Sequence, residues 1–86
     1  MESWNGVIDR YRSRLPVSET TRTISLNEGN TPLIRATNLE RQLDARYAIW
    51  LKYEGLNPTA SFKDRGMTVA VTSAVQRGAR AVICAS

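Results

Sequence analysis

The sequence predicts an α/β fold built on a strand–helix–strand (βαβ) unit whose sheet is incomplete within this chain. Residues 47–53 form an aromatic and β-branched run, which is typical of a strand buried on much of both faces. Apolar side chains then recur at helical spacing from Met67 to Val75, and residues 81–85 form a second short apolar run. The two strands of such a unit are expected to be parallel neighbours.

A sheet of this kind needs more strands than the chain supplies. A right-handed crossover implies helices on both faces of the sheet, and two or three strands would leave unpaired edges open. A chain of 86 residues is at most one small domain with a marginal core. We therefore expect residues 1–86 to be the N-terminal fragment of a larger α/β domain.

The first half of the chain predicts a helix, a connector, a short strand and a second helix. The amphipathic spacing of Trp4, Val7, Ile8, Tyr11 and Leu15 favours a helix over about residues 4–14, which Pro16 would end. Residues 17–23 are polar and predict a connector. Turn-forming residues follow at 28–32, then a short extended piece at residues 33–34 and a helix at residues 38–43.

The second half predicts a loop between the strand at residues 47–53 and a longer helix. The loop covers residues 54–60, and the helix runs from about residue 62 to residue 77. Gly78 stands where a left-handed residue closes a helix C-terminus.

The composition is that of an ordinary water-soluble protein, with 42% hydrophobic and 23% charged residues. No run approaches the roughly 20 apolar residues that span a bilayer, and residues 1–6 lack the layout of a signal peptide, so we expect a cytoplasmic protein. Cys84, the single cysteine, lies in an apolar run without a local metal-binding partner. We expect it to be a buried structural thiol.

The net charge of +4 raises the question of a nucleic-acid partner. Arg10, Arg12 and Arg14 form the one dense basic group, but Glu2 and Asp9 lie close by and no aromatic ladder accompanies them. We expect a solvated helix face there. A small basic binding module remains an alternative, and it would require salt-sensitive binding to nucleic acid.

Lys63 is the strongest candidate for chemistry, because it stands at a predicted helix start, where the helix dipole disfavours a cation by about 0.3 to 1 kcal/mol. Ser61 and Asp64 have the spacing of a capping box, so local structure explains them but does not explain Lys63 and Arg65. One interpretation is an exposed, tolerated charge. The other is a lysine whose ammonium form is disfavoured, so that its neutral amine can attack an aldehyde.

Three segments carry a resemblance to a known family. Residues 57–67 (Asn-Pro-Thr-Ala-Ser-Phe-Lys-Asp-Arg-Gly-Met) resemble the cofactor-lysine segment of pyridoxal-phosphate enzymes of the tryptophan synthase β-subunit-like fold, or fold type II. Within that fold they are most similar to the threonine synthase family. Residues 28–33 resemble its Glu-Gly-x-Thr-Pro-Leu motif, and residues 52–59 resemble the strand and loop that lead to its cofactor lysine.

Related families differ in their local motifs. Threonine and serine dehydratases usually show Gly-Ser-Phe-Lys-x-Arg-Gly-Ala, whereas the cysteine synthase group tends to have Ser-Val-Lys-Asp-Arg. Thr59, Phe62, Asp64 and Met67 favour the threonine synthase family, although Ala60 stands where a glycine is often found. Cysteate synthase and threonine dehydratase remain alternatives.

The resemblance implies that Lys63 is both the cofactor-binding and the catalytic residue, holding pyridoxal 5′-phosphate and serving as the acid–base group. The implied reaction converts O-phospho-L-homoserine and water to L-threonine and phosphate. Ser86 matches the serine that opens the family's Ser-Thr-Gly-Asn-Thr substrate loop, so we expect it to contact substrate. A homodimeric full-length enzyme is also implied, with no metal, nucleic acid or membrane partner.

The resemblance further implies that parts of a catalytic domain are missing from these residues. These parts are the remainder of the substrate loop, the glycine-rich loop for the cofactor phosphate and the group that faces the pyridine nitrogen. We therefore expect the 86-residue chain alone to be inactive. A non-catalytic truncated remnant remains an alternative, and it makes no functional demand on Lys63.

Overall fold

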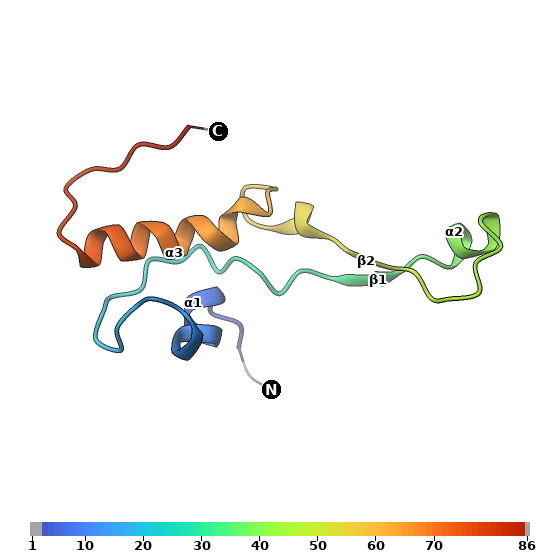
Figure 1. The fold of residues 1–86 in the computed structure, drawn as a ribbon, viewed down its shortest axis with the longest axis horizontal. Helices are drawn as coiled ribbons and strands as arrows, with labels where there is room; N and C mark the ends of the chain where they lie inside the picture. The colour runs from blue at the N-terminus through green and yellow to red at the C-terminus, as the bar shows by residue number, and fades with distance from the viewer. Residues whose placement is uncertain (1–2, 86) are drawn as a thin grey trace.

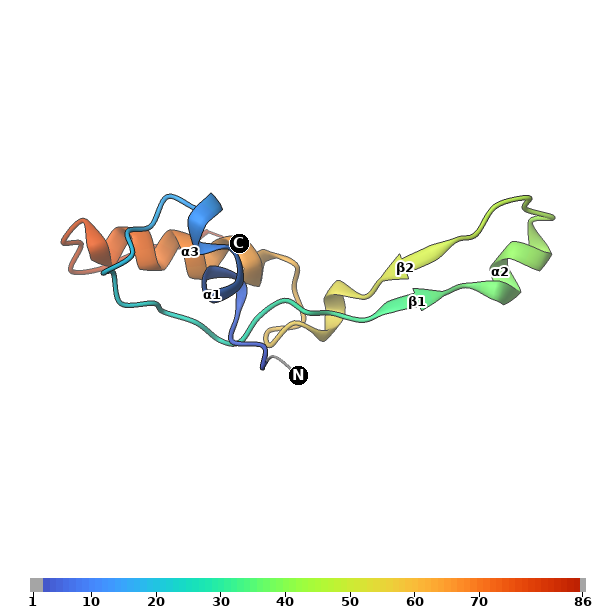
Figure 2. The ribbon, with the colours of Figure 1, turned by 90° about the horizontal axis from the view of Figure 1, so that it is seen from below.

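The computed structural model describes residues 3–85, which form a helical part and a long thin arm (Figures 1 and 2). The molecule measures 54 × 34 × 18 Å. Helices α1 and α3 lie together at one end, the two strands form the arm, and α2 sits at the arm's tip. The elements in chain order are α1 (Val7–Tyr11), a 3₁₀ turn (Arg12–Arg14), β1 (Leu33–Arg35), α2 (Thr37–Gln42), β2 (Trp50–Lys52), a second 3₁₀ turn (Glu54–Leu56) and α3 (Lys63–Gln76).

The arm is an antiparallel pair of short strands. Leu33 of β1 lies opposite Lys52 of β2, and Arg35 lies opposite Trp50. At the tip, Glu40 of α2 accepts hydrogen bonds from the Arg35 guanidinium and from the backbone N–H of Ile49, at 2.5 and 2.7 Å. This Arg35 hydrogen bond and the Ile49 N–H lower the pKa of Glu40 to about 2.

The expectation for the strand at residues 47–53 is corrected in three ways. The strand covers only Trp50–Lys52, all three of its residues are exposed, and its partner is β1 in antiparallel pairing. Residues 81–85, the expected parallel neighbour, form no strand and are exposed, with Ile83 fully exposed. Within residues 3–85 no strand lies beside 81–85 to pair its backbone, and a strand without a ladder partner has nothing to hold it.

The N-terminal helix begins later than its apolar spacing predicts. It starts at Val7 and continues as the 3₁₀ turn to Arg14, while Gly6 before it has a φ of +97°. Trp4, expected inside the helix, instead donates from its indole Nε1 to the backbone oxygen of Glu28 at 2.6 Å. Val7 and Ile8 are the buried apolar residues of the described chain, and their helix α1 packs against α3.

The predictions for the other helices are confirmed to within one or two residues. Helix α2 covers Thr37–Gln42, and α3 covers Lys63–Gln76. Gly78 has a φ of +86°, its N–H donates to Val75 O, and the N–H of Ala79 donates to Ala74 O, both at 3.0 Å. These two bonds form the Schellman motif that a glycine at this position allows.

The buried face of α3 is polar. Asp64, Thr68 and Thr72 are buried at four-residue spacing, and Gln76, which is exposed, follows at the same spacing. The chain between residues 18 and 28 runs antiparallel along this stripe: Gln76 Oε1 accepts from the Ser18 N–H at 3.2 Å, and Thr72 Oγ1 accepts from the Ile24 N–H at 3.0 Å. The stripe therefore supplies hydrogen bonds to an extended backbone that has no strand partner.

The apolar stripe that predicts α3 does not form its packed face. Met67 is 37% exposed and Val75 is 49% exposed. The neighbours of the helix among residues 3–85 are α1 and an extended backbone, which needs donors and acceptors more than apolar contact. None of the helices in this described part has the length and apolar character needed to cross a membrane.

Only two of the three N-terminal arginines form the expected solvated face. Arg10 and Arg14 are exposed, whereas Arg12 donates to Ser18 O at 2.6 Å and also to Thr23 Oγ1. Arg12 thus ties the first helical segment to the connector. Cys84 is exposed and not buried as expected, because its run of residues packs against no other element.

Candidate functional site

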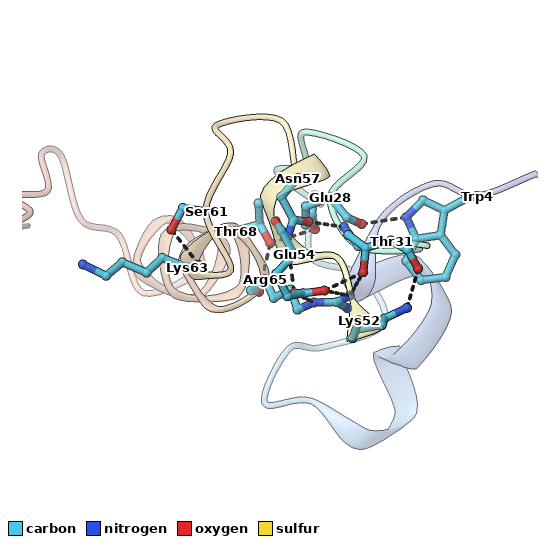
Figure 3. A network of polar contacts seen from close by, with 11 residues as sticks. Trp4, Glu28, Thr31, Lys52, Glu54, Asn57, Ser61, Lys63, Arg65 and Thr68 are labelled. Atoms are coloured by element: carbon cyan, nitrogen blue, oxygen red, sulfur yellow. Dashed lines mark hydrogen bonds and ion pairs between the residues drawn. The ribbon is translucent and has the colours of Figure 1, made fainter. Parts of the chain in front are cut away.

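Lys63 is the first residue of α3, where the sequence places it. Phe62 occupies the N-cap without a side-chain capping bond. Ser61 Oγ accepts from the N–H of Lys63 at 3.1 Å, two residues on and not three, so the expected capping box does not form. The Lys63 side chain is exposed and points away from the polar network on the other side of the helix (Figure 3).

Asp64 lies on the inward side of the same turn. It is 5% exposed, and its Oδ2 accepts from the N–H of Thr59 at 2.8 Å while its Oδ1 accepts from Thr59 Oγ1. The loop between these two residues includes Ala60 at a φ of +61°, in the left-handed region that L-residues other than Asn and Asp rarely adopt. Both ends of this six-residue loop are therefore held by one carboxylate.

The surroundings of Lys63 fit the cofactor that the sequence resemblance implies. An open hollow of about 460 Å³ lies beside the first turn of α3, lined by Phe62, Lys63, Arg65, Gly66 and Met67. Phe62 and Met67 offer apolar surface on which an aromatic ring can lie. Lys63 is the residue there with a primary amine, the group that reacts with an aldehyde.

A buried carboxylate joins α1, the extended segment and α3 (Figure 3). Glu28 is fully buried. Its Oε1 accepts hydrogen bonds from Thr68 Oγ1 at 2.8 Å and from the Val7 N–H at 3.2 Å. Its Oε2 accepts from Ser25 Oγ and from the Leu26 N–H, both at 3.0 Å. Burial alone would raise the pKa of Glu28, but the Thr68 hydroxyl and the backbone N–H groups together lower it below its ordinary value. The carboxylate thus stays charged in a buried place because its hydrogen bonds satisfy it.

A second cluster fixes the loop after β2 to the start of α3. Arg65 donates to both oxygens of Glu54, and its Nη2 also donates to Thr31 Oγ1 at 3.1 Å. Asn57 is buried; its Nδ2 donates to Glu54 O at 2.9 Å and its Oδ1 accepts from the Gly29 N–H at 2.8 Å. The hydrogen bonds from Arg65 and Thr31 lower the pKa of Glu54 from its ordinary 4.5 to about 2.

These contacts bring together the three segments that the sequence analysis singled out. Residues 28–33, 52–59 and 57–67 meet at the Glu54 carboxylate, which accepts from Thr31 and Arg65, and the Lys52 ammonium also donates to Thr31 O (Figure 3). Glu28 and Glu54 are organising residues that the sequence motifs do not single out. Their one common signal is that each directly precedes a glycine inside a motif, which leaves the backbone room to turn.

Ser86, the expected substrate contact, lies outside the described residues. Among residues 3–85, no three His, Cys, Asp or Glu side chains gather in a way that could hold a metal ion.

Comparison with known proteins gives one family. The family model described as "Pyridoxal-phosphate dependent enzyme" matches residues 24–86. The chain is 59% identical over 85 residues to the threonine synthase of Mycobacterium tuberculosis (strain H37Rv). The matched region covers 99% of this chain and 23% of that protein. It is 53% identical over 83 residues to the threonine synthase of Synechocystis, with coverages of 96% and 22%.

A third relative extends the match over the whole chain. The threonine synthase of Halalkalibacterium halodurans is 49% identical over 86 residues, covering 100% of this chain and 24% of that protein. The chain therefore spans slightly less than a quarter of the length of these curated relatives.

Proposed function

Because this chain belongs to the family of pyridoxal-phosphate dependent enzymes, we propose that it is the N-terminal segment of a threonine synthase catalytic domain. The reaction is the conversion of O-phospho-L-homoserine and water to L-threonine and phosphate. The observation that carries this proposal is the identity of 49 to 59% to proteins named threonine synthase over nearly the entire chain. The fold proposed for the whole domain is fold type II.

Lys63 is the catalytic and cofactor-binding residue of this proposal. Its side chain is exposed at the first turn of α3, beside an apolar hollow, and its Nζ would hold the cofactor covalently in the resting enzyme. When bound, pyridoxal phosphate supplies an electron sink for the carbanions that the reaction forms. Lys63 Nζ would also be the acid–base group that moves protons at the α and β carbons of the substrate.

Lys52 offers a comparison within the same chain, which contains two lysines. The Lys52 ammonium donates to the backbone oxygen of Thr31, between the arm and the helical part. Lys52 thus helps to hold the arm against the helical part, whereas Lys63 lies beside the hollow. The position of each amine therefore favours Lys63 as the cofactor lysine.

The remaining parts of the proposal concern residues and partners outside the described contacts. Ser86 contacts the substrate as the first residue of a substrate loop. The full-length enzyme is a cytoplasmic homodimer that takes a small-molecule substrate and binds neither nucleic acid nor membrane. Gel filtration with light scattering on the full-length protein tests the dimer, and titration with duplex DNA tests the absence of nucleic-acid binding.

The central experiment uses the full-length product of the gene that encodes this segment. The protein is loaded with pyridoxal phosphate, and phosphate release from O-phospho-L-homoserine is measured for wild type, Lys63→Ala, Lys63→Arg and Lys52→Arg. We expect activity in wild type and Lys52→Arg, and a loss of at least about a thousandfold in both Lys63 variants, because neither alanine nor arginine can bind the aldehyde.

Reduction with borohydride followed by peptide mapping identifies the labelled lysine. A label on Lys63 is expected. Phosphate release that survives Lys63→Ala, or a label on another lysine, overturns the assignment. Deamination of L-threonine without phosphate release would identify a dehydratase. Formation of cysteate and phosphate from O-phospho-L-serine and sulfite would identify a cysteate synthase, and a cofactor that never binds would identify a non-catalytic remnant.

A further inference from the structure

We infer that Asp64 is a positioning residue for Lys63: by binding Thr59 at both donors, it fixes the rotation of the first turn of α3 and so the direction in which Lys63 presents its amine. This inference rests on the proposed role of Lys63 as the cofactor lysine. It assigns to the neighbouring carboxylate a function that the reaction itself does not require.

The contacts of Asp64 define a closed loop. Its two carboxylate oxygens accept from the N–H and from the hydroxyl of Thr59, and the side chain is 5% exposed. Since a charged acceptor that receives two hydrogen bonds from one residue fixes both distance and orientation, residues 59 and 64 are held in one geometry. Lys63 lies inside the loop that this contact closes.

The geometry of a helix converts this anchor into a direction for Lys63. Consecutive residues differ by about 100° around the helix axis, so an inward Asp64 places Lys63 on a different side of the same turn. Asp64 belongs to the buried stripe that continues with Thr68 and Thr72, whereas Lys63 is exposed beside the apolar hollow. A rotation of the first turn would move Asp64 out of the stripe and, at the same time, change the direction in which the Lys63 side chain points.

The backbone before Lys63 shows that the loop needs an anchor. Ala60 has a φ of +61°, a left-handed backbone conformation that is strained for an alanine. The N–H of Ala60 donates to Asn57 O at 2.7 Å on one side of this residue, and the bonds between Thr59 and Asp64 close the loop around it. A backbone in this region persists where the surrounding contacts determine it, and the two acceptors are Asn57 and Asp64.

An acid in the first turn of a helix also stabilises the helix through its dipole, and this effect must be separated from positioning. Substitutions at Thr59 make the separation, because they leave the charge of Asp64 in place. Thr59→Val removes the hydroxyl donor but keeps the backbone N–H, and Thr59→Ser keeps both donors. Asp64→Asn keeps one acceptor oxygen and removes the charge.

The test uses the full-length protein freed of cofactor. The rate at which pyridoxal 5′-phosphate binds is followed by visible absorbance from pH 6 to pH 9, the share trapped on Lys63 by borohydride is measured by peptide mapping, and kcat and KM are measured separately. Thermal unfolding of each variant reports on folding. The variants are Asp64→Ala, Asp64→Asn, Thr59→Val and Thr59→Ser.

If Asp64 positions Lys63, the variants should slow the labelling of Lys63 to different degrees. Asp64→Ala should slow labelling of Lys63 by about tenfold or more and lower kcat more than it changes KM, because a misdirected amine affects the chemical step. Thr59→Val should show a smaller loss, and Thr59→Ser should label at the wild-type rate. If Asp64→Ala does not fold, the comparison of Thr59→Val with Thr59→Ser decides the question.

The outcomes separate this inference from the proposed function. Wild-type protein labelled at Lys63, with folded Asp64→Ala labelled equally fast, overturns the positioning role alone. Equal rates for Thr59→Val and Thr59→Ser in the absence of folded Asp64→Ala do the same. Wild-type protein that is never labelled at Lys63 overturns the proposed function and this inference together.

Discussion

Arg65 and Glu54 form a two-point ion pair that joins the first turn of α3 to the turn after β2. Arg65 Nε donates to Glu54 Oε1 at 2.5 Å, and Nη2 donates to Oε2 at 3.0 Å. From the sequence, both Arg65 and Lys63 are cations at a helix start, where the dipole disfavours them. The tertiary structure supplies Arg65 with an acidic partner, Glu54, so a structural role explains the cation at this position and no catalytic role is needed.

The ion pair predicts a pH-dependent stability. The Arg65 and Thr31 hydrogen bonds lower the pKa of Glu54 from 4.5 to about 2, so the unfolded state takes up this proton at a higher pH than the folded state does. The stabilisation is complete above pH 4.5 and is lost as the pH falls toward 2. Urea unfolding of the full-length protein is measured between pH 3 and pH 7. As the pH falls, the free energy of unfolding should decrease less for Glu54→Gln than for wild type.

The control for this prediction is Glu19→Gln, which also removes one negative charge, at an exposed residue outside the ion pair. It should keep the wild-type acid profile. An identical profile for Glu54→Gln and wild type would show that the pair contributes nothing to folding in this range.

Thr68 is expected to stabilise the fold through its hydroxyl. Thr68→Val keeps the side-chain shape but leaves Glu28 Oε1 with the Val7 N–H alone, so the free energy of unfolding should fall by about 1 to 2 kcal/mol. Thr68→Ser keeps the donor and should lose less. The measurement is urea denaturation at pH 7, and a Thr68→Val variant as stable as Thr68→Ser would contradict the prediction.

Ala60 is expected to be a strained position at which glycine is better. Its φ of +61° costs an alanine about 1 to 2 kcal/mol, and the greater freedom of glycine in the unfolded chain offsets part of the gain. Ala60→Gly should therefore raise the free energy of unfolding by about 0.5 to 1 kcal/mol. The opposite change at Gly78, whose φ is +86°, should lower it by about 1 kcal/mol. A fall in the melting temperature of Ala60→Gly would count against this account of the loop.

Gly29 is expected to tolerate no side chain. A Cβ atom there would lie 2.8 Å from Trp4 Cζ2 and 3.1 Å from Arg65 Nη1, at a φ of +88°. Gly29→Ala should cost about 2 kcal/mol or more. Gly66→Ala is the matched change inside α3. Among residues 3–85, no atom other than those of the adjoining residues and the local helix backbone lies within 4 Å of the new Cβ, so the variant should gain up to about 1 kcal/mol. Equal melting temperatures for the two variants would refute the prediction.

The 86-residue chain by itself is expected to be inactive. The apolar stripe of α3 and the arm expose large apolar side chains, among them Met67, Val75 and Trp50, which favours a loosely packed molecule with a broad melt. Phosphate release from O-phospho-L-homoserine by the purified chain should equal that of its Lys63→Ala variant. Release that depends on Lys63 at this length would contradict the expectation.

The sequence predicts well what short-range interactions decide. The bounds of α3, the C-terminal cap at Gly78 and the place of Lys63 at the helix start follow from spacing and backbone preference over a few residues, and the structure confirms all three. The family also follows from local motifs, because residues 28–33 and 57–67 resemble two motifs of the family and both lie in the region that the family model matches.

Only the tertiary structure decided which side of each element is packed and what each strand pairs with. The exposure of β2, the absence of a strand at residues 81–85 and the polar buried face of α3 all depend on which partners lie near, and the same sequence pattern allows several partners. Glu28 and Glu54 became organising residues because distant donors converge on them, Thr68 on the first and Arg65 on the second. The sequence by itself therefore determined α2, α3, the family motifs and the candidate lysine. The start of α1, the strand pairing, the burial and the carboxylate networks required the fold, since they arise from contacts between residues far apart in the chain.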